Sequence, residues 1–180
     1  RDDCTVIWGT SGTEIFNLLA DSPAAAGKRV LTSRLEHPAL LAALRRSAAE
    51  VKFAPCGKDG RLLPPEDSGA ELAAFHQVQS ELGVRQELRP LPGVPLFVDA
   101  IQAAGKLPLP PEFDLAAVSG HKFGAPGGAA LLAHPRFAGK GKLAEFAHRY
   151  RHVEYRCGRP EPALLLTLAF AATRRRAARE

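Results

Sequence analysis

The sequence predicts an α/β domain, a three-layer α/β/α sandwich around a mostly parallel β-sheet. Short apolar runs alternate along the chain with amphipathic stretches of helical periodicity, and turns rich in Gly, Pro and small polar residues separate them. Strands that alternate with helices pair in parallel through crossover connections. Functional residues are then expected just beyond the carboxyl ends of the strands.

Each element of this fold has its own local signal. Short apolar runs are expected as buried strands at residues 5–8, 29–33, 51–54, 95–99, 115–119 and 129–133. Amphipathic stretches are expected as helices at residues 14–20, 38–50 and 163–179. Residues 71–78 fit either a strand or the end of a helix, and residues 100–104 have helix-like character. The Pro-rich stretches near 64–65 and 108–111 are expected as loops.

Length and composition indicate one globular domain. The chain has 180 residues, of which 46% are hydrophobic and 24% are charged, and this is enough to bury a core. It contains no apolar run of the roughly 18 residues that a membrane span needs. It opens on Arg1-Asp2-Asp3 rather than on a signal peptide. We therefore expect no membrane association.

The charges and the cysteines indicate which ligands and which cellular location to expect. Much of the net charge of +5 lies in residues 174–179, where a basic helix end suits the negative C-terminal dipole, so nucleic-acid binding is not expected. Cys4, Cys56 and Cys157 are far apart and form no metal-binding pair. We expect neither a metal site nor a disulfide framework, and a reducing, cytoplasmic location is the simpler expectation.

A carboxylate ends the most apolar expected strand, at Asp99. A buried carboxylate is costly unless it is paired, and a protonated pyridine nitrogen would be a suitable partner. Alternatively, Asp99 caps the helix-like stretch that follows it.

A lysine follows the next expected strand in a glycine-rich turn, Ser119-Gly120-His121-Lys122-Phe123-Gly124. Such a turn lets the backbone approach a ligand closely, and a partly desolvated lysine is nucleophilic. Alternatively, Lys122 is an ordinary exposed loop lysine.

Two further motifs lie earlier in the chain. The turn Gly9-Thr10-Ser11-Gly12-Thr13 opens the first expected helix, where N–H groups and hydroxyls suit a phosphate; a plain helix cap is the alternative. In Glu36-His37-Pro38, the ring of His37 could lie flat against an aromatic ligand, or His37 could be a surface or capping residue. Together the four motifs match the needs of pyridoxal 5′-phosphate (PLP) for a lysine, a carboxylate, a phosphate cradle and a stacking partner.

The order and spacing of these motifs resemble the class V aminotransferase family, and within it the cysteine desulfurases. Residues 97–106 and 119–128 resemble the family's VDAxQxxGK and SGHKxxGPxG motifs, with Asp99 and Lys122 23 positions apart. Residues 10–17 resemble its TSGATExNN motif, and residues 33–39 resemble its EHPA stretch. The resemblance covers essentially residues 5–133.

The resemblance implies a role for each residue around the cofactor ring. Lys122 would hold the aldehyde of PLP as an imine, and Asp99 would pair with the pyridine nitrogen. Gln102 would hydrogen-bond the phenolic oxygen. His37 would stack on the ring face and shuttle protons.

The resemblance also implies the phosphate site. Thr13 and the backbone of Gly12 would hold the phosphate, with help from Ser119 and His121.

The chain departs from the family at several places. Ser80 stands where the family usually has an asparagine that contacts the phenolic oxygen. Arg159 stands where a phosphate-binding threonine of the neighbouring subunit is expected, and the glycine-poor stretch 146–155 matches poorly. Residues 1–180 are expected to be the PLP-binding large domain alone, without the family's N-terminal segment and small C-terminal domain. The family's persulfide cysteine lies in that missing part, and none of the three cysteines matches it.

By resemblance, the expected activity is that of a cysteine desulfurase. Such an enzyme converts L-cysteine to L-alanine with transfer of the sulfur to an enzyme persulfide. The resemblance further implies a homodimer, a sulfur-acceptor protein and a place in iron–sulfur cluster assembly. The alternatives are another class V enzyme, such as a selenocysteine lyase or a small-amino-acid aminotransferase, and a catalytically impaired PLP-binding fragment.

Overall fold

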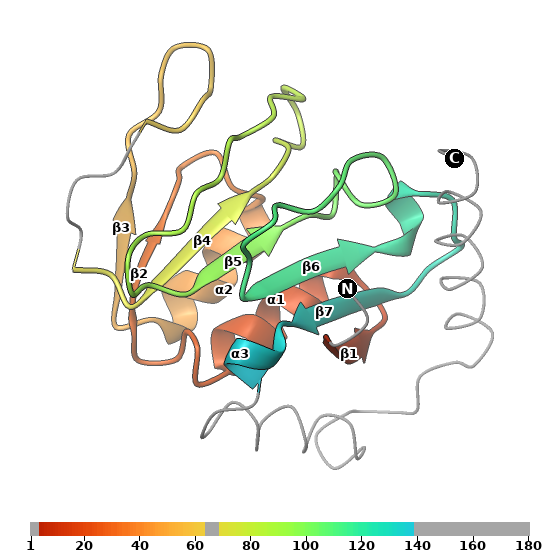
Figure 1. Ribbon diagram of the computed structural model, residues 1–180, viewed down its shortest axis with the longest axis horizontal. Helices are drawn as coiled ribbons and strands as arrows, with labels where there is room; N and C mark the ends of the chain where they lie inside the picture. The colour runs from red at the N-terminus through yellow and green to blue at the C-terminus, as the bar shows by residue number, and fades with distance from the viewer. Residues whose placement is uncertain (1–3, 64–68, 139–180) are drawn as a thin grey trace.

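A seven-stranded sheet forms the centre of the fold (Figure 1). The structure is a computed structural model that describes residues 4–63 and 69–138. The strands lie in the order β1-β7-β6-β5-β4-β2-β3. Their bounds are β1 (Thr5–Gly9), β2 (Arg29–Thr32), β3 (Glu50–Phe53), β4 (Leu72–His76), β5 (Leu96–Asp99), β6 (Leu115–Ser119) and β7 (Ala129–Ala133).

The sheet is mostly parallel, as the sequence predicts. The pairs β2–β3, β2–β4, β4–β5 and β5–β6 are parallel, whereas β7 runs antiparallel to both of its neighbours, β6 and β1. Two antiparallel pairings in succession restore the original direction. The carboxyl end of β1 therefore lies at the same edge of the sheet as those of β2, β4, β5 and β6.

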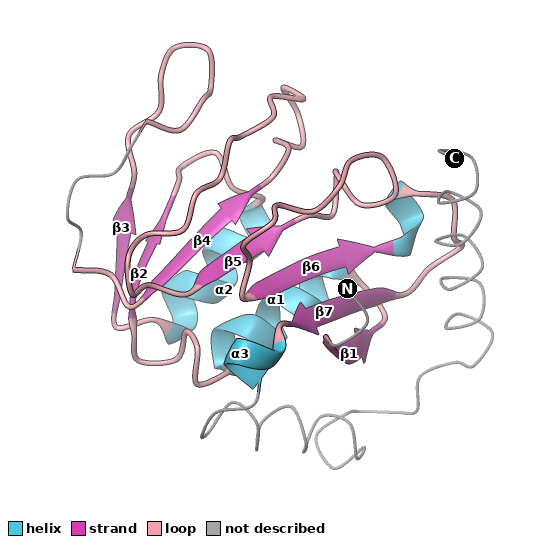
Figure 2. Cartoon of the chain, in the orientation of Figure 1, coloured by secondary structure: helices cyan, strands magenta, loops and turns pink. Residues whose placement is uncertain are grey.

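Two helices cover one face of the sheet (Figure 2). They are α1 (Gly12–Asp21) and α2 (Pro38–Ser47), and a short 3₁₀ turn, η1 (Gly120–Lys122), and α3 (Pro135–Ala138) complete the described helical elements. The apolar side of α1 packs on the sheet, where the rings of Phe16 and Phe97 meet edge to face with their centroids 6.4 Å apart. α1 lies mainly behind β6 and β7, and Phe16 reaches across to Phe97 of β5.

Loop segments cover the other face in the part of the chain that the structure describes. Phe75, Val98 and Phe113 form a buried cluster there, against which partly buried side chains such as Leu88 and Leu109 pack from the connections around β5. The α/β class is thus confirmed, while no described helix forms the third layer that the sequence predicts.

Several expected boundaries shift. The ambiguous segment 71–78 contains β4, whose five residues are all buried. Residues 100–104 form turns rather than an α-helix. The helix expected over 38–50 ends at Ser47, because β3 begins at Glu50. The helix expected over 163–179, the stretch 146–155 and the Pro64-Pro65 loop lie outside the described residues.

No helix within residues 4–63 and 69–138 is both long enough and apolar enough to cross a membrane.

Candidate active site

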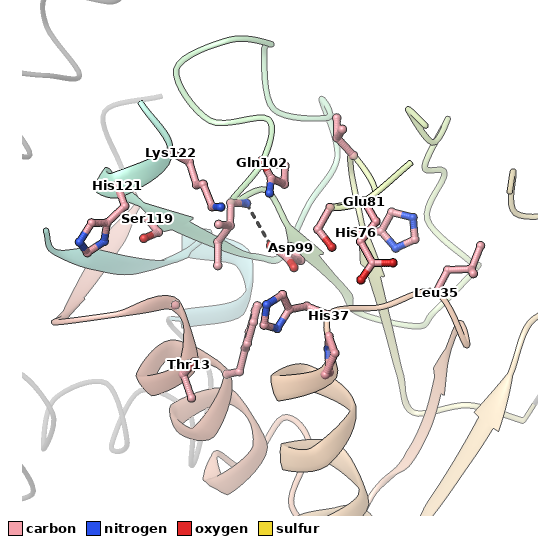
Figure 3. A pocket seen from close by; sticks show the side chains of 16 residues that line it. Thr13, Leu35, His37, His76, Glu81, Asp99, Gln102, Ser119, His121 and Lys122 are labelled. Carbon is pink, nitrogen blue, oxygen red and sulfur yellow. Dashed lines mark hydrogen bonds between the residues drawn. The ribbon is translucent and has the colours of Figure 1, made fainter. Parts of the chain in front are cut away.

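The strand ends enclose a cavity of about 530 Å³ (Figure 3). Its walls come from the segments that directly follow the carboxyl ends of β1, β2, β4, β5 and β6. The lining includes all eight of the site residues expected from the sequence: Gly12, Thr13, His37, Asp99, Gln102, Ser119, His121 and Lys122. The sheet order therefore brings together side chains that lie up to 110 positions apart in the chain (122 minus 12).

The amino end of α1 forms one wall. Ser11 is the N-cap and accepts a hydrogen bond from the N–H of Glu14 at 3.2 Å, and the N–H of Ile15 bonds the Ser11 carbonyl. The N–H groups of Gly12 and Thr13 precede that first helical bond and lie at the positive end of the helix dipole. The helix cap and the phosphate site expected from the sequence are thus both compatible with this geometry.

Gly12 lies close to the turn after β5. A Cβ atom at this position would lie 2.6 Å from Cδ1 of Ile101, well inside van der Waals contact. A larger residue at position 12 would require the end of the Ile101 side chain to shift.

Asp99 ends β5 and is the most perturbed acid of the cavity. Burial raises the pKa of its carboxyl to about 6, against a lowering by the hydrogen bond from the N–H of Ile101 at 3.0 Å. The negative charge of Glu36 raises the pKa further, and a charge on His76 would lower it. No ion pair found among the described residues involves Asp99.

His37 has the capping role that the sequence left open, and it also lines the cavity. Its Nδ1 accepts a hydrogen bond from the N–H of Ala39 at 3.1 Å, and Pro38 follows at the first position of α2. Its exposed ring lies 5.9 Å from the ring of Phe16 at an angle of 40°. The capping bond fixes the ring beside the cavity on the helix-covered side of the sheet.

Lys122 extends toward Asp99 from the turn after β6 (Figure 3). Its side chain is exposed, and so is that of His121, whereas Ser119 is buried. The partly desolvated lysine expected from the sequence is therefore not what the structure shows. The residue after Lys122, Phe123, packs against the backbone of Gly105. Gly105 has a φ of +73°, and a Cβ atom at this position would lie 2.5 Å from Cβ of Phe123.

Sequence reasoning missed a buried polar cluster next to Asp99. His76 ends β4 and lines the cavity, and its Nδ1 lies 2.8 Å from Oε1 of Glu36. Gln86 contacts the other ring nitrogen of His76 at 3.1 Å. The position of His76 at a strand end, one strand away from Asp99, was the available signal, because parallel strands end at a common edge.

Ser80 also lines the cavity, and it is exposed. The loop that carries it is held by Gln79, whose Oε1 accepts hydrogen bonds from the N–H groups of Glu81 and Leu82. Within residues 4–63 and 69–138, no group of three His, Cys, Asp or Glu side chains could hold a metal ion. Cys4 and Cys56 are free thiols outside the cavity lining.

Comparison with known proteins shows which family the chain belongs to. The family model described as aminotransferase class-V matches residues 1–145. The chain belongs to the class V aminotransferase family. This confirms the resemblance drawn from the motifs around Asp99 and Lys122.

Within this class V family, the chain is similar to cysteine desulfurases. It is 34% identical to the cysteine desulfurase IscS of Anaeromyxobacter sp. (strain Fw109-5), over 71% of the chain and 37% of the relative. It is 30% identical to IscS of Azotobacter vinelandii, over 73% of the chain and 38% of the relative. The chain thus spans less than two fifths of the length of these relatives.

Two solved structures share the fold of the chain. DndA from Streptomyces lividans superimposes with a TM-score of 0.76 at 27% sequence identity, over 96% of the chain and 56% of DndA. A NifS-like protein from Rickettsia africae superimposes with a TM-score of 0.75 at 20% identity, over 96% of the chain and 51% of that protein.

Proposed function

We propose that residues 1–180 form the PLP-binding large domain of a cysteine desulfurase-like enzyme. The observation that carries this function is the convergence of Asp99 and Lys122, from the ends of two adjacent parallel strands, on one cavity. Similarity to IscS proteins over most of the chain supports the choice of cysteine desulfurase within the family.

The cavity fits PLP on three counts. Its volume of about 530 Å³ lies in the range that small-molecule sites occupy. A buried carboxylate with a pKa raised to about 6 suits the protonated nitrogen of a pyridine ring. The amino end of α1, with Gly12 and Thr13, suits a phosphate dianion.

Each residue then has a binding task at the ring. Asp99 accepts the pyridine N–H, and Gln102 donates a hydrogen bond to the phenolic oxygen. The ring of His37 covers one face, because its capping bond to Ala39 holds it beside the cavity. Lys122 provides the amine that binds the aldehyde.

The phosphate would be held by residues at the amino end of α1 and at the carboxyl end of β6. Gly12 and Thr13 hold it with first-turn N–H groups and a hydroxyl, and Ser119 and His121 approach from the end of β6. The family's asparagine contact to the phenolic oxygen is weaker in this chain, because Ser80 has a shorter side chain.

Bound PLP supplies an electron sink for the carbon atoms of an amino-acid substrate. Around it, Lys122 and His37 are the groups that take up and return protons, and Asp99 keeps the pyridine proton in place. The substrate we propose is L-cysteine, with L-alanine as the product.

The sulfur needs an acceptor thiol. Neither Cys4 nor Cys56 lines the cavity, and Cys157 lies outside the described residues. We therefore assign the persulfide to a cysteine outside residues 4–63 and 69–138. The proposal also includes a homodimer, a sulfur-acceptor protein, a role in iron–sulfur cluster assembly and a cytoplasmic location.

A catalytically impaired PLP-binding protein is the second candidate, favoured by the exposed Ser80 in the cavity wall. One experiment separates the two. The purified chain is mixed with PLP, the violet absorbance of lysine-bound cofactor is recorded, and L-cysteine is then added with a thiol reductant.

Binding and turnover give distinct outcomes. Lys122→Ala should abolish the absorbance band, while Lys58→Ala, in an exposed turn of the same chain, should leave it unchanged. Absence of the band in the unaltered chain would refute PLP binding. A band with no release of alanine or sulfide would favour the second candidate.

A further inference from the structure

Three buried polar side chains lie behind Asp99 without a task in the proposed function. Glu36 and His76 are joined by a contact of 2.8 Å, with side-chain exposures of 0% and 3%. Gln86, also buried, contacts the far side of the His76 ring. Polar groups buried to this degree are costly unless they are arranged to satisfy one another.

The orientation of the Gln86 amide is fixed by the backbone. Its Oε1 accepts a hydrogen bond from the N–H of Leu62 at 2.9 Å, and its Nε2 donates to the carbonyl of Gly60 at 2.9 Å. Exchanging the oxygen and the nitrogen would break both bonds, because an N–H can only donate and a carbonyl can only accept.

This orientation determines where the proton of His76 resides. The second hydrogen of Gln86 Nε2 faces Nε2 of His76 at 3.1 Å, so that ring nitrogen must accept. The proton of a neutral imidazole then lies on Nδ1, which donates to Glu36. The neutral form of His76 therefore has a defined tautomer, with its proton on Nδ1.

Glu36 then carries an uncompensated negative charge. Its Oε1 accepts from Nδ1 of His76 and from the hydroxyl of Ser33 at 2.6 Å. The Ser33 hydroxyl oxygen itself accepts from the N–H of Leu35, which leaves its hydrogen free for Glu36. Two hydrogen bonds donated to Oε1 stabilise the charged form of a carboxylate, while Oε2 is buried without a hydrogen-bond partner among the described residues.

This charge lies close to Asp99. His76 and Asp99 are partners in the register of β4 and β5, and both line the cavity. The other titratable side chains of the cavity wall are His37 at the start of α2, Glu81 in the loop after β4, and His121 and Lys122 in η1. All four are exposed, so solvent screens their charges more than it screens Glu36.

We propose that Glu36, His76 and Gln86 are positioning residues that control the charge of Asp99. They keep a buried negative charge and a neutral imidazole behind its carboxylate. The carboxylate is thereby kept basic, which makes Asp99 a better acceptor for the N–H of a pyridine ring. The purpose of this arrangement rests on the proposed function. The effect of the Glu36 charge on the Asp99 carboxyl, in contrast, is present in the chain without PLP.

The test is a pH titration of Asp99 in the chain without PLP. Aspartate labelled with carbon-13 at the carboxyl gives a signal for each Asp, and Asp99→Asn identifies the one at issue. Glu36→Gln removes the charge but keeps a carbonyl oxygen for Ser33 and His76. It should lower the midpoint of the Asp99 titration by roughly one pH unit.

The control is Glu50→Gln, which removes an exposed charge at the start of β3 and should leave the midpoint unchanged. An unchanged midpoint in Glu36→Gln would mean that the pair is merely structural. It would overturn the proposal.

A second measurement needs no folded variant. Nitrogen-15 shifts of the histidines in the unaltered chain should show the proton of the His76 imidazole on Nδ1. A proton on Nε2, or a cationic ring, would equally overturn the proposal. Both measurements are made without PLP and do not depend on cofactor binding, so they can succeed or fail separately from the proposed function.

Discussion

Replacing Asp99 by asparagine should make the cofactor-free chain more stable at neutral pH. The carboxyl has a pKa of 3.8 in its unperturbed state and of about 6 in the fold, chiefly because it is buried. One pKa unit is worth about 1.4 kcal/mol, so the ionised carboxylate costs up to about 3 kcal/mol of folding free energy. Asparagine removes this cost and keeps an oxygen for the N–H of Ile101.

The sign of the pH dependence follows from the raised pKa. Below about pH 3.8 the carboxyl is protonated in both the folded and the unfolded chain, and the cost is absent. As the pH rises toward 6, the unfolded chain loses its proton first, so the native state is progressively destabilised. The advantage of Asp99→Asn should therefore be full above about pH 6 and fade toward pH 4.

Urea unfolding of the chain stripped of PLP measures this effect. At pH 7.5 the midpoint of Asp99→Asn should lie about 1.5 M above that of the unaltered chain, taking a denaturant slope of about 2 kcal/mol per molar. Asp114→Asn is the matched control, because Asp114 is a buried acid that pairs with Arg136 at 2.7 Å and accepts from the N–H of Leu96. It should lose stability. If Asp99→Asn gains nothing at pH 7.5, or gains equally at pH 4, burial does not govern this carboxyl.

Two further substitutions separate the site from the scaffold. Gly12→Ala should weaken PLP binding in an equilibrium titration, because the new Cβ would lie 2.6 Å from Cδ1 of Ile101 and would displace that side-chain end in the cavity wall. Ile101→Val, which removes that methyl, should restore part of the affinity when the two are combined. Leu131→Ala, in the core under α1, should cost 2–5 kcal/mol in urea unfolding. Below the unfolding transition, Leu131→Ala should have only a small effect on PLP affinity. A loss of affinity as large as that of Gly12→Ala would contradict the separation of the binding site from the hydrophobic core.

The site could be predicted from the sequence because each of its residues follows a strand of strong apolar character. Asp99 ends β5 and Lys122 lies in the turn after β6, and parallel strands end at one edge of the sheet. Gly12 joins them only because β7 runs antiparallel between β1 and β6. The antiparallel placement of β7 has no local signal, so the family motifs rather than the periodicity placed Gly12 in the site.

The Glu36–His76–Gln86 cluster could not be predicted, since its three members come from separate elements. A histidine at the end of an apolar strand is as often a satisfied core residue as a functional one. Its tautomer depends on the carbonyl of Gly60 and the N–H of Leu62, which are backbone groups of a loop whose path no side-chain pattern specifies. Among the described residues, loops rather than helices cover the second face of the sheet for a related reason. The connections before and after β5 are apolar enough to cover the sheet, but Pro90 and Pro108 fall within them and interrupt helices.

The features of the cavity that reduce the stability of the empty chain are those that a single ligand would compensate. Burial raises the pKa of the Asp99 carboxyl in the cavity wall, and the buried Glu36 lies behind it. Gly12 and Thr13, in the first turn of α1, form another part of the wall. A ring with a protonated nitrogen and a phosphate dianion reverses both costs at once. Neither an amino acid alone nor inorganic phosphate alone has both groups, so each should stabilise the chain against urea far less than PLP does at the same concentration.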